Sequence, residues 1–293
     1  GNEQARLNEC LAKRKFSGDG EFTKLISSYL TGFHSSSKIL LTTSCTDALE
    51  MCALLLDIKD GDEVIMHSYT FVSTALAYIM RGATIKFGDS ENNRPHLDVK
   101  SVESLITSRT KAIVPVNYGG SGCHLGALRY LCDINNVIMI EDNAQGICGK
   151  YIGQALGTYG ALSTLSFHES KNIQCGEGGA LVINDSKYAA RAEVLREKGT
   201  NRSSFFRGEV NKYGWSDLGS SFLMSDILAA FLSAQLEKAD EITLMRRVIY
   251  SRYYNELSGL ENLGLTLPCP VKDTNAHIFY LVCTSLEQRT SYI

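Results

Sequence analysis

The stretch Val137-Ile-Met-Ile-Glu-Asp142 joins four consecutive apolar residues to two carboxylates. A strand that is apolar on both faces is typical of a parallel sheet that helices cover on each side. In such sheets the ligand binds beyond the carboxyl ends of the strands. Asp142, which ends this segment, is therefore aimed at the place where a ligand is expected.

Strand-like runs alternate with helical patterns on both sides of this segment. The alternation predicts an α/β fold with a mainly parallel, mixed sheet flanked by helices. A helical stretch at 239–257 leads to a further predicted strand at 278–282. We therefore expect a large domain at 1–238 and the start of a smaller one at 239–293. The other expected strands are 63–66, 84–87, 112–116, 137–140, 161–167 and 180–183, and the other expected helices are 47–56, 73–80, 99–107 and 125–135.

The composition of the 293-residue chain excludes several classes of protein. Its 29 Lys and Arg residues are interspersed with 32 Asp and Glu residues, so no basic block suggests a nucleic-acid-binding surface. No apolar run approaches the roughly 18 residues that span a bilayer. Nine scattered cysteines without a Cys-x-x-Cys pair suit a reducing compartment, and the six histidines lack the spacing of metal ligands. We expect a cytoplasmic protein without nucleic-acid, membrane or metal partners.

One segment of the chain has the residues of a phosphate-binding site. The segment Thr42-Thr-Ser-Cys-Thr46 precedes the helical run 47–56. Free N–H groups at a helix start, together with hydroxyls, can hold a phosphate, although the same residues also serve as ordinary helix caps. No P-loop occurs, since Gly149-Lys150 is followed by Tyr151, and Gly120-Ser-Gly122 lacks the third glycine of a dinucleotide-binding motif. P-loop and standard dinucleotide enzymes are therefore disfavoured.

Two more candidates follow predicted strands. Asp142, with Gln145 three residues later, can bind a metal, act as a base, pair with a protonated ring nitrogen or simply cap a helix. Lys171 lies between the strand 161–167 and the glycine-rich Gly176-Glu-Gly-Gly179, where it can form an imine with an aldehyde or remain a solvated loop lysine. A phosphate cradle, a strand-end carboxylate and a loop lysine are together the parts that pyridoxal 5′-phosphate requires.

A series of short segments narrows the class further. They are Ser17-Gly-Asp-Gly-Glu-Phe-Thr23, Thr43-Ser-Cys-Thr46, Leu54-Leu-Leu-Asp57, Gly61-Asp-Glu-Val-Ile-Met66, Ser68-Tyr-Thr-Phe-Val-Ser-Thr74, Glu141-Asp-Asn-Ala-Gln-Gly146, Ser166-Phe-His-Glu-Ser-Lys-Asn172, Gly176-Glu-Gly-Gly179, Arg196-Glu-Lys-Gly-Thr-Asn-Arg202, Phe205-Phe-Arg-Gly208 and Gly219-Ser-Ser-Phe-Leu-Met-Ser-Asp226. In this order the chain resembles the sugar aminotransferases of the DegT/DnrJ/EryC1/StrS family, a branch of the fold-type I pyridoxal-phosphate enzymes. The resemblance covers essentially the whole chain.

The resemblance implies a role for each matching residue. Lys171 matches the lysine that binds the cofactor covalently and shuttles a proton, and Asp142 matches the partner of the pyridine nitrogen. Gln145 matches the residue near the O3′ hydroxyl, and Phe71 matches the aromatic side chain stacked on the ring. The expected phosphate contacts are Ser44, Cys45, Thr46 and Ser166.

The family also places an asparagine from the neighbouring subunit at the phosphate. In this chain the matching position is Ser221, so the resemblance implies a homodimer with shared active sites. Gly18-Asp-Gly20 and the segment 202–207 are weaker candidates for the nucleotide-sugar side. Two residues depart from the family pattern: His67 stands where proline is common, and Asn117 stands where histidine is common. Neither departure is expected to remove a cofactor contact.

The implied reaction moves an amino group from glutamate to C4 of a dTDP-4-keto-6-deoxyhexose and gives dTDP-4-amino-4,6-dideoxygalactose. Amination at C3, or a different nucleotide carrier, is the alternative within enzymes. A catalytically silent homologue that only binds the cofactor, such as a regulator, is the alternative outside enzymes. The intact Lys171 also argues against the relatives that are dehydratases, in which histidine replaces this lysine. Against the family, the small C-terminal domain is expected to be incomplete.

Overall fold

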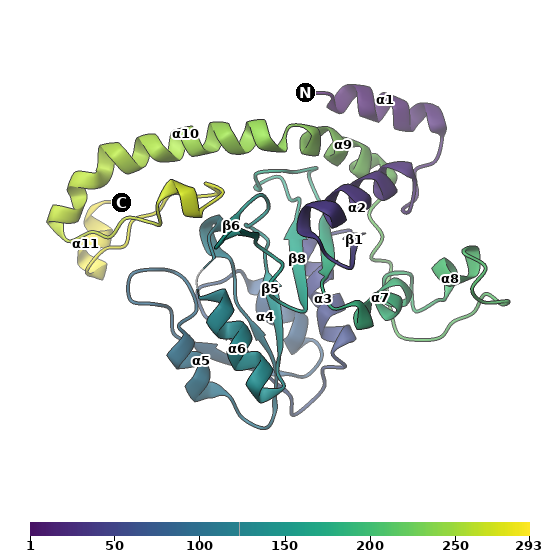
Figure 1. Ribbon diagram of the computed structural model, residues 1–293, viewed down its shortest axis with the longest axis horizontal. Coiled ribbons are helices and arrows are strands. Elements are labelled where there is room, and N and C mark those ends of the chain that lie inside the picture. Colours follow the sequence, from purple (N-terminus) through teal and green to yellow (C-terminus); the bar gives the residue numbers. More distant parts are fainter. Residues whose placement is uncertain (123) are drawn as a thin grey trace.

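The computed structural model describes residues 1–122 and 124–293, and a sheet of seven strands forms its centre (Figure 1). The strands are β1 (Lys38–Thr42), β2 (Glu63–His67), β3 (Thr84–Gly88), β4 (Thr110–Val114), β5 (Ile138–Asp142), β8 (Leu162–Ser166) and β9 (Gly179–Ile183). They follow the order β1-β9-β8-β5-β4-β2-β3. The pairs from β8 to β3 are parallel, whereas β9 is antiparallel to both β1 and β8. The predicted α/β fold with a mainly parallel, mixed sheet is therefore confirmed.

Helices cover both faces of the sheet, because successive strand residues point to opposite sides. In β2, Val64 and Met66 belong to a buried apolar cluster on one face, whereas Ile65 belongs to another cluster on the opposite face. The first face is covered by α3 (Cys45–Leu55), α4 (Val72–Ile79) and α7 (Ala189–Arg196), and the second by α5 (Val99–Leu105), α6 (Leu125–Asn135), α2 (Glu21–His34) and α9 (Asp226–Glu237).

A buried carboxylate joins the beginning of α2 to the beginning of α9. Asp226 accepts hydrogen bonds from the backbone N–H groups of Phe22 (3.3 Å) and Thr23 (2.8 Å) and from the Thr23 hydroxyl (2.7 Å). These bonds satisfy donors that the first turn of α2 would otherwise leave without partners. A Cβ on Gly20 would lie 2.1 Å from Oδ2 of Asp226, so the close approach requires glycine. This contact explains part of the Gly18-Asp-Gly20 motif.

The C-terminal part of the chain leaves the sheet. In Figure 1, α10 (Ala239–Leu257) runs along one end of the molecule, and extended chain returns from it toward α11 (Leu286–Ser291). The prediction of a strand at 278–282 was wrong, since the segment forms only an isolated bridge between Val282 and Thr266. A strand needs a hydrogen-bonded neighbour along its length, and within residues 1–122 and 124–293 only Val282 of this segment has a paired strand-like partner.

The remaining elements are short or peripheral. No helix in the described part of the chain is long and apolar enough to cross a membrane. Among the same residues there is no group of three or more His, Cys, Asp or Glu side chains that could hold a metal ion. The short or peripheral elements are α1 (Glu3–Lys13), α8 (Arg202–Phe206), the pair β6 (Lys150–Tyr151) and β7 (Gln154–Ala155), and the 3₁₀ turns Tyr118–Gly120, Ser186–Tyr188, Ser258–Leu263 and Val271–Asp273.

Candidate active site

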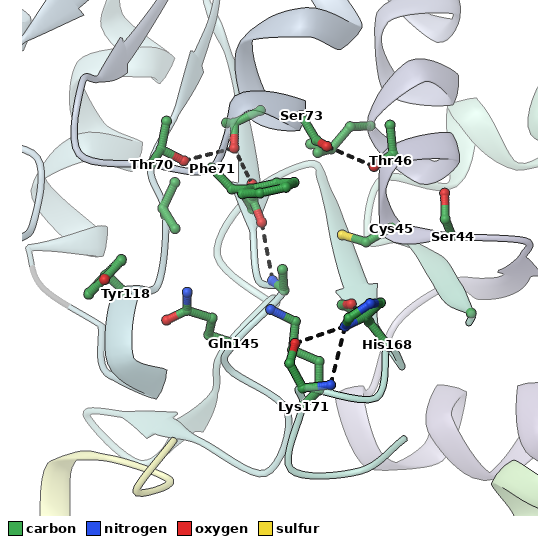
Figure 2. Close-up of a pocket in the computed structure, with 18 of the residues that line it drawn as sticks. Ser44, Cys45, Thr46, Thr70, Phe71, Ser73, Tyr118, Gln145, His168 and Lys171 are labelled. Carbon is green, nitrogen blue, oxygen red and sulfur yellow. Dashed lines mark hydrogen bonds between the residues drawn. The ribbon is translucent and has the colours of Figure 1, made fainter. Parts of the chain in front are cut away.

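A cavity of about 290 Å³ lies at the carboxyl ends of the parallel strands. Figure 2 shows Phe71 across the cavity from Lys171, with Tyr118 and Gln145 on one side and Ser44, Cys45 and Thr46 on the other. The cavity brings together eight of the nine residues that the sequence predicted. These are Ser44, Cys45, Thr46, Phe71, Asp142, Gln145, Ser166 and Lys171.

One wall of the cavity is the beginning of α3. Ser44 caps this helix, because its hydroxyl accepts the backbone N–H of Asp47 at 3.0 Å, and the helix therefore begins at Cys45. Thr46 donates its hydroxyl hydrogen to Ser73 at 2.9 Å. The first N–H groups of a helix and its dipole attract an anion. The alternative of a helix cap is thus correct for Ser44, and the geometry leaves room for a phosphate as well.

The start of β9 packs unusually closely against this helix start. A Cβ on Gly179 would lie 2.3 Å from the carbonyl carbon of Ser44 and 2.4 Å from the backbone nitrogen of Cys45. Only glycine fits at this distance, so the last glycine of Gly176-Glu-Gly-Gly179 lets the sheet pack against the start of α3. We call this start of α3, residues 44–46, the phosphate wall. Burial raises the pKa of the Cys45 thiol, first by desolvation and then through the nearby charge of Asp142. This thiol therefore remains protonated and uncharged beside an anion.

Asp142, the last residue of β5, is only 4% exposed. Burial raises the pKa of its carboxyl group, while a 2.6 Å hydrogen bond from the Thr74 hydroxyl and a 3.2 Å bond from the Ala144 N–H lower it, as does the charge of Lys171. Among the described residues, no Lys, Arg or His side chain forms an ion pair with this carboxylate. A buried carboxylate without a cationic partner fits a protonated ring nitrogen.

A second buried carboxylate supports the same strand end from the opposite face. Glu141 is fully buried, and burial raises the pKa of its carboxyl group while four hydrogen bonds lower it. Because neighbouring strand residues alternate in direction, this network fixes β5 without entering the cavity. The donors are Nδ2 of Asn117 (3.0 Å) and the backbone N–H groups of Gly157 (2.9 Å), Tyr159 (2.7 Å) and Gly160 (2.9 Å).

The amide of Gln145 has a defined orientation. Its Oε1 accepts the backbone N–H of Gly119 at 2.7 Å. Since a backbone N–H can only donate, the Nε2 amine is the group left to face the cavity. An amine at this position is suited to donate to a phenolic oxygen such as the O3′ of pyridoxal phosphate. This orientation is compatible with the role expected for Gln145, which remains a prediction.

Phe71 precedes α4, and its side chain is 73% exposed while it lines the cavity. An aromatic ring of this size is usually covered by other atoms, and here the cavity lies against it. A planar ligand of similar size would cover one face of the ring. Tyr118 completes this end of the cavity, and its hydroxyl lies 3.4 Å from that of Tyr69.

Lys171 lies in the loop that connects β8 to β9. Backbone hydrogen bonds from Phe167 to Gly178 (2.8 Å) and from Cys175 to Phe167 (2.8 Å) close the base of the loop. The N–H of Lys171 itself donates to the carbonyl of His168 at 2.9 Å. The loop is therefore an ordered connection that presents the lysine to the cavity, which argues against a freely solvated side chain.

Ser221 is the predicted residue that does not line the cavity of its own chain. It is exposed, and its backbone forms an isolated bridge with Glu197. Sequence reasoning in turn missed several lining residues. Thr74 could have been found, because it lies three residues after Phe71 at the helix start that faces β5. The other missed lining residues are Leu49, Thr70, Ser73, Val116, Tyr118, Ala144, His168, Ser170, Glu177 and Gly178.

These residues fit pyridoxal phosphate. The start of α3 and its hydroxyls suit the phosphate, and the carboxylate of Asp142 suits the ring nitrogen. The open face of Phe71 suits the ring, and Lys171 suits the aldehyde. When bound, this cofactor supplies an aldehyde for the lysine and a protonated ring that withdraws electrons from the reacting carbon. With the cofactor bound, Asp142 would hold the proton on the ring nitrogen and the Nζ of Lys171 would be placed to move a proton. The hydrogen bond from Thr74 favours the ionised form of Asp142.

Comparison with known proteins leads to the same chemistry. The sequence model of the DegT/DnrJ/EryC1/StrS aminotransferase family matches residues 1–292 of this chain. GDP-perosamine synthase of Escherichia coli O157:H7 is 33% identical over 89% of this chain and 70% of its own length. The dTDP-3-amino-3,4,6-trideoxy-alpha-D-glucose transaminase of Streptomyces venezuelae is 33% identical over 80% of this chain and 59% of its own length.

A solved structure extends the comparison to the fold. NtdA from Bacillus subtilis, with its bound cofactor PMP, superposes with a TM-score of 0.88 at 27% identity. The superposition covers 99% of this chain and 64% of that one. The chain belongs to the DegT/DnrJ/EryC1/StrS aminotransferase family and is a pyridoxal-phosphate-dependent aminotransferase of sugar nucleotides.

Proposed function

We propose that this enzyme transfers the amino group of glutamate to C4 of a dTDP-4-keto-6-deoxyhexose and forms dTDP-4-amino-4,6-dideoxygalactose. The observation that supports the aminotransferase reaction is that Lys171 and the buried Asp142, which has no ion-pair partner among the described residues, share one cavity with the start of α3. The choice of C4 and of the sugar rests on the motif resemblance. One of the two relatives is named for a GDP sugar and the other for a dTDP sugar. The choice of dTDP as the nucleotide carrier is therefore also proposed.

Each residue then has a defined task. The N–H groups at the start of α3 bind the phosphate, and Asp142 holds a proton on the ring nitrogen. Phe71 covers one face of the ring and excludes water from it. The Nζ of Lys171 would accept a proton from the reacting carbon of the substrate and later return a proton. The same movement in reverse serves the keto sugar, so one lysine suffices for both halves of the reaction.

The active site is proposed to be shared between two copies of the chain. Phe71 and the outer face of α4 form a contiguous exposed apolar surface at the mouth of the cavity. Its members are Phe71 (73% exposed), Val72 (61%), Leu76 (45%), Ile79 (48%) and Met80 (68%). Apolar surfaces of this kind mark interaction sites. In the homodimer, Ser221 of the partner subunit would reach the phosphate, in agreement with its exposed position outside its own cavity.

The division of the chain and its location are also proposals. Residues 1–238 are proposed as the cofactor-binding domain, since the three large apolar clusters contain buried residues no later than Ala239. Residues 239–293 are proposed as the start of the small domain, in which Leu265, Leu267 and Cys269 are buried apart from those clusters. We further propose that the enzyme acts in the cytoplasm.

The decisive experiment incubates the purified enzyme with pyridoxal phosphate, glutamate and dTDP-4-keto-6-deoxyglucose, followed by mass and NMR analysis of the sugar. We expect an amine at C4 with the galactose configuration and one equivalent of 2-oxoglutarate. An amine at C3, or turnover only with another nucleotide in a panel of keto sugars, would replace the proposed substrate while keeping the class of reaction.

Lys171→Ala is the matched control for the catalytic role. It should abolish turnover and the visible absorbance of the lysine-bound cofactor, while dialysis still detects cofactor held by the phosphate wall. If the variant keeps that absorbance band, Lys171 is not the covalent attachment site. If the wild type binds the cofactor but does not convert glutamate to 2-oxoglutarate, the silent homologue becomes the better description.

A further inference from the structure

The segment Thr274–His277 lies against three loops of the cofactor site. The Thr274 hydroxyl donates to the carbonyl of Gly119 at 3.0 Å, and the backbone N–H of Asn275 donates to the carbonyl of Gly120 at 3.0 Å. The Nδ2 of Asn275 donates to the carbonyls of Gln145 and Ile147, both at 2.7 Å. Asn275 is completely buried, so these bonds are not shared with solvent.

The contact is close enough to constrain both sides. Gly120 has a positive φ of 75°, and a Cβ there would lie 1.6 Å from Oδ1 of Asn275. Ala276 has a φ of 58°, which is unfavourable for a residue with a side chain. Two bonds hold it in place: its N–H donates to Oγ1 of Thr274 at 3.0 Å, and the N–H of His277 donates to Oδ1 of Asn275 at 3.0 Å. Such a conformation persists only where its surroundings fix it.

His277 reaches the residue next to the catalytic lysine. Its Nδ1 lies 2.9 Å from Oδ1 of Asn172, and Nδ2 of Asn172 donates to the carbonyl of Asn275 at 3.2 Å. Because a carbonyl only accepts, the amine of Asn172 must face Asn275, and Oδ1 must face the imidazole. Nδ1 of His277 therefore carries the hydrogen. Asn172 is 7% exposed, and Ile173 after it is fully buried, so the chain is fixed immediately beyond Lys171.

The imidazole of His277 is uncharged at neutral pH. Burial lowers its pKa to about 4, and the positive charges of Lys171 and Arg246 act in the same direction. The other charged group that holds this segment is Arg247, whose Nε donates to the carbonyl of Thr274 at 3.3 Å. Arg246 donates from α10 to the carbonyls of Ala276 (3.1 Å) and His277 (2.6 Å). A neutral imidazole can orient Asn172 without repelling the lysine.

We propose that His277, acting through Asn172, is a positioning residue for Lys171, and that the Thr274–His277 segment supplies this restraint from the C-terminal part of the chain. The inference rests on the proposed role of Lys171 as the attachment site of the cofactor. Its value to the reaction is geometric. A lysine amine held at the aldehyde reacts as an intramolecular group, and small losses of orientation slow such reactions strongly.

The test separates attachment of the cofactor from its binding. Apoprotein is mixed with pyridoxal phosphate and cyanoborohydride, which reduces the C=N bond that Nζ and the aldehyde form with loss of water. Intact mass against time gives the rate of covalent labelling, and equilibrium dialysis without reductant on the Lys171→Ala background gives the affinity of the non-covalent site. His277→Leu should slow labelling about tenfold with little change in that affinity. His277→Asn, which can restore a donor near Nδ1, should recover the rate to within about twofold of the wild type.

Two further variants keep the outcome unambiguous. Asn172→Asp sets a carboxylate oxygen against the carbonyl of Asn275 and should also slow labelling. His34→Leu removes another buried histidine, which bonds only to Leu30 in α2 at 3.1 Å among the described residues, and should leave labelling unchanged. Wild-type labelling by His277→Leu, or parallel losses of rate and affinity that His277→Asn does not reverse, would overturn the positioning role. If the wild type itself is not labelled at Lys171, the proposed function fails first.

Discussion

Replacing Gly179 with alanine should damage the phosphate wall while leaving the fold intact. Gly179 opens β9 and pairs with Thr42 on one side and Ser166 on the other. A Cβ there would lie 2.3 Å from the carbonyl carbon of Ser44 and 2.4 Å from both the Cys45 nitrogen and the Ser44 oxygen. All three are backbone atoms, so no side chain can rotate away. Because two strands hold Gly179, the start of α3 has to move.

The size of the effect follows from these distances. Nonbonded carbon atoms lie about 3.5–4.0 Å apart, so the first turn of α3 must retreat by roughly 1 Å. Overpacking of this kind destabilises a protein by about 1–3 kcal/mol. A retreat of this size would weaken the hydrogen bonds from the start of α3 to the phosphate, and a hydrogen bond to a charged group contributes about 1.5–3 kcal/mol. We therefore expect the affinity for pyridoxal phosphate to fall by about 10- to 100-fold.

Equilibrium dialysis measures the affinity, and urea unfolding of the apoprotein measures the free energy of unfolding. Gly32→Ala is the matched control, since Gly32 lies in α2 and an added Cβ there meets nothing within 4 Å. This control should keep the wild-type affinity and gain up to about 1 kcal/mol of stability. Wild-type affinity in Gly179→Ala would refute the conclusion that the start of α3 binds the phosphate.

Three further variants test the polar groups around the cavity. Thr74→Val removes the 2.6 Å hydrogen bond to Asp142, so the pKa of that carboxyl group should rise further. Dialysis should then show that the cofactor binds at least about tenfold more weakly. Glu141→Gln turns an amine against two N–H donors, so urea unfolding should show a loss of about 2–5 kcal/mol, and a loss below about 1 kcal/mol would contradict the network. His67→Leu should remove up to about 3 kcal/mol of acid sensitivity between pH 7 and pH 4, measured by urea unfolding at each pH.

The sign of the last effect follows from burial. His67 is fully buried, neither ring nitrogen has a partner among the described residues, and desolvation lowers its pKa to about 4. Between this value and the ordinary value of about 6.5, the unfolded chain binds a proton and the folded chain does not. Acid therefore favours unfolding in this window, and the stability is fully present only above it. Identical pH profiles for wild type and His67→Leu would contradict this assignment.

Local patterns were sufficient for most of the sheet and most of the cavity. The strand at 137–140 and the carboxylate after it could be predicted because apolar runs and strand-end ligands are properties of neighbouring residues. The start of α3 was predicted two residues late, since the cap bond from Asp47 to Ser44 places the first turn at Cys45. The segment 278–282 has the composition of a strand, yet composition says nothing about whether a neighbour is present.

The contacts of Asn275 lie beyond any local pattern. Its partners Gln145 and Ile147 are 130 and 128 residues away along the chain. Such contacts depend on how the C-terminal part packs against the cofactor loops, and a single sequence carries no signal for that packing. The contacts of this buried amide could therefore not be predicted before the fold was known, although one of its partners, Gln145, was already in the predicted site.

Asn117 and His67, the two departures from the family pattern, both lie outside the cavity. Asn117 donates to Glu141 and, at 2.8 Å, to Oδ1 of Asn143, so it belongs to the polar network that fixes β5. His67 ends β2 in line with Ile65, which packs on the face opposite α3 and α4. Neither residue lines the cavity, and Asp142 faces the other way. Substitutions in this layer can alter stability and its dependence on pH, as expected for His67, while every residue assigned to the cofactor keeps its place.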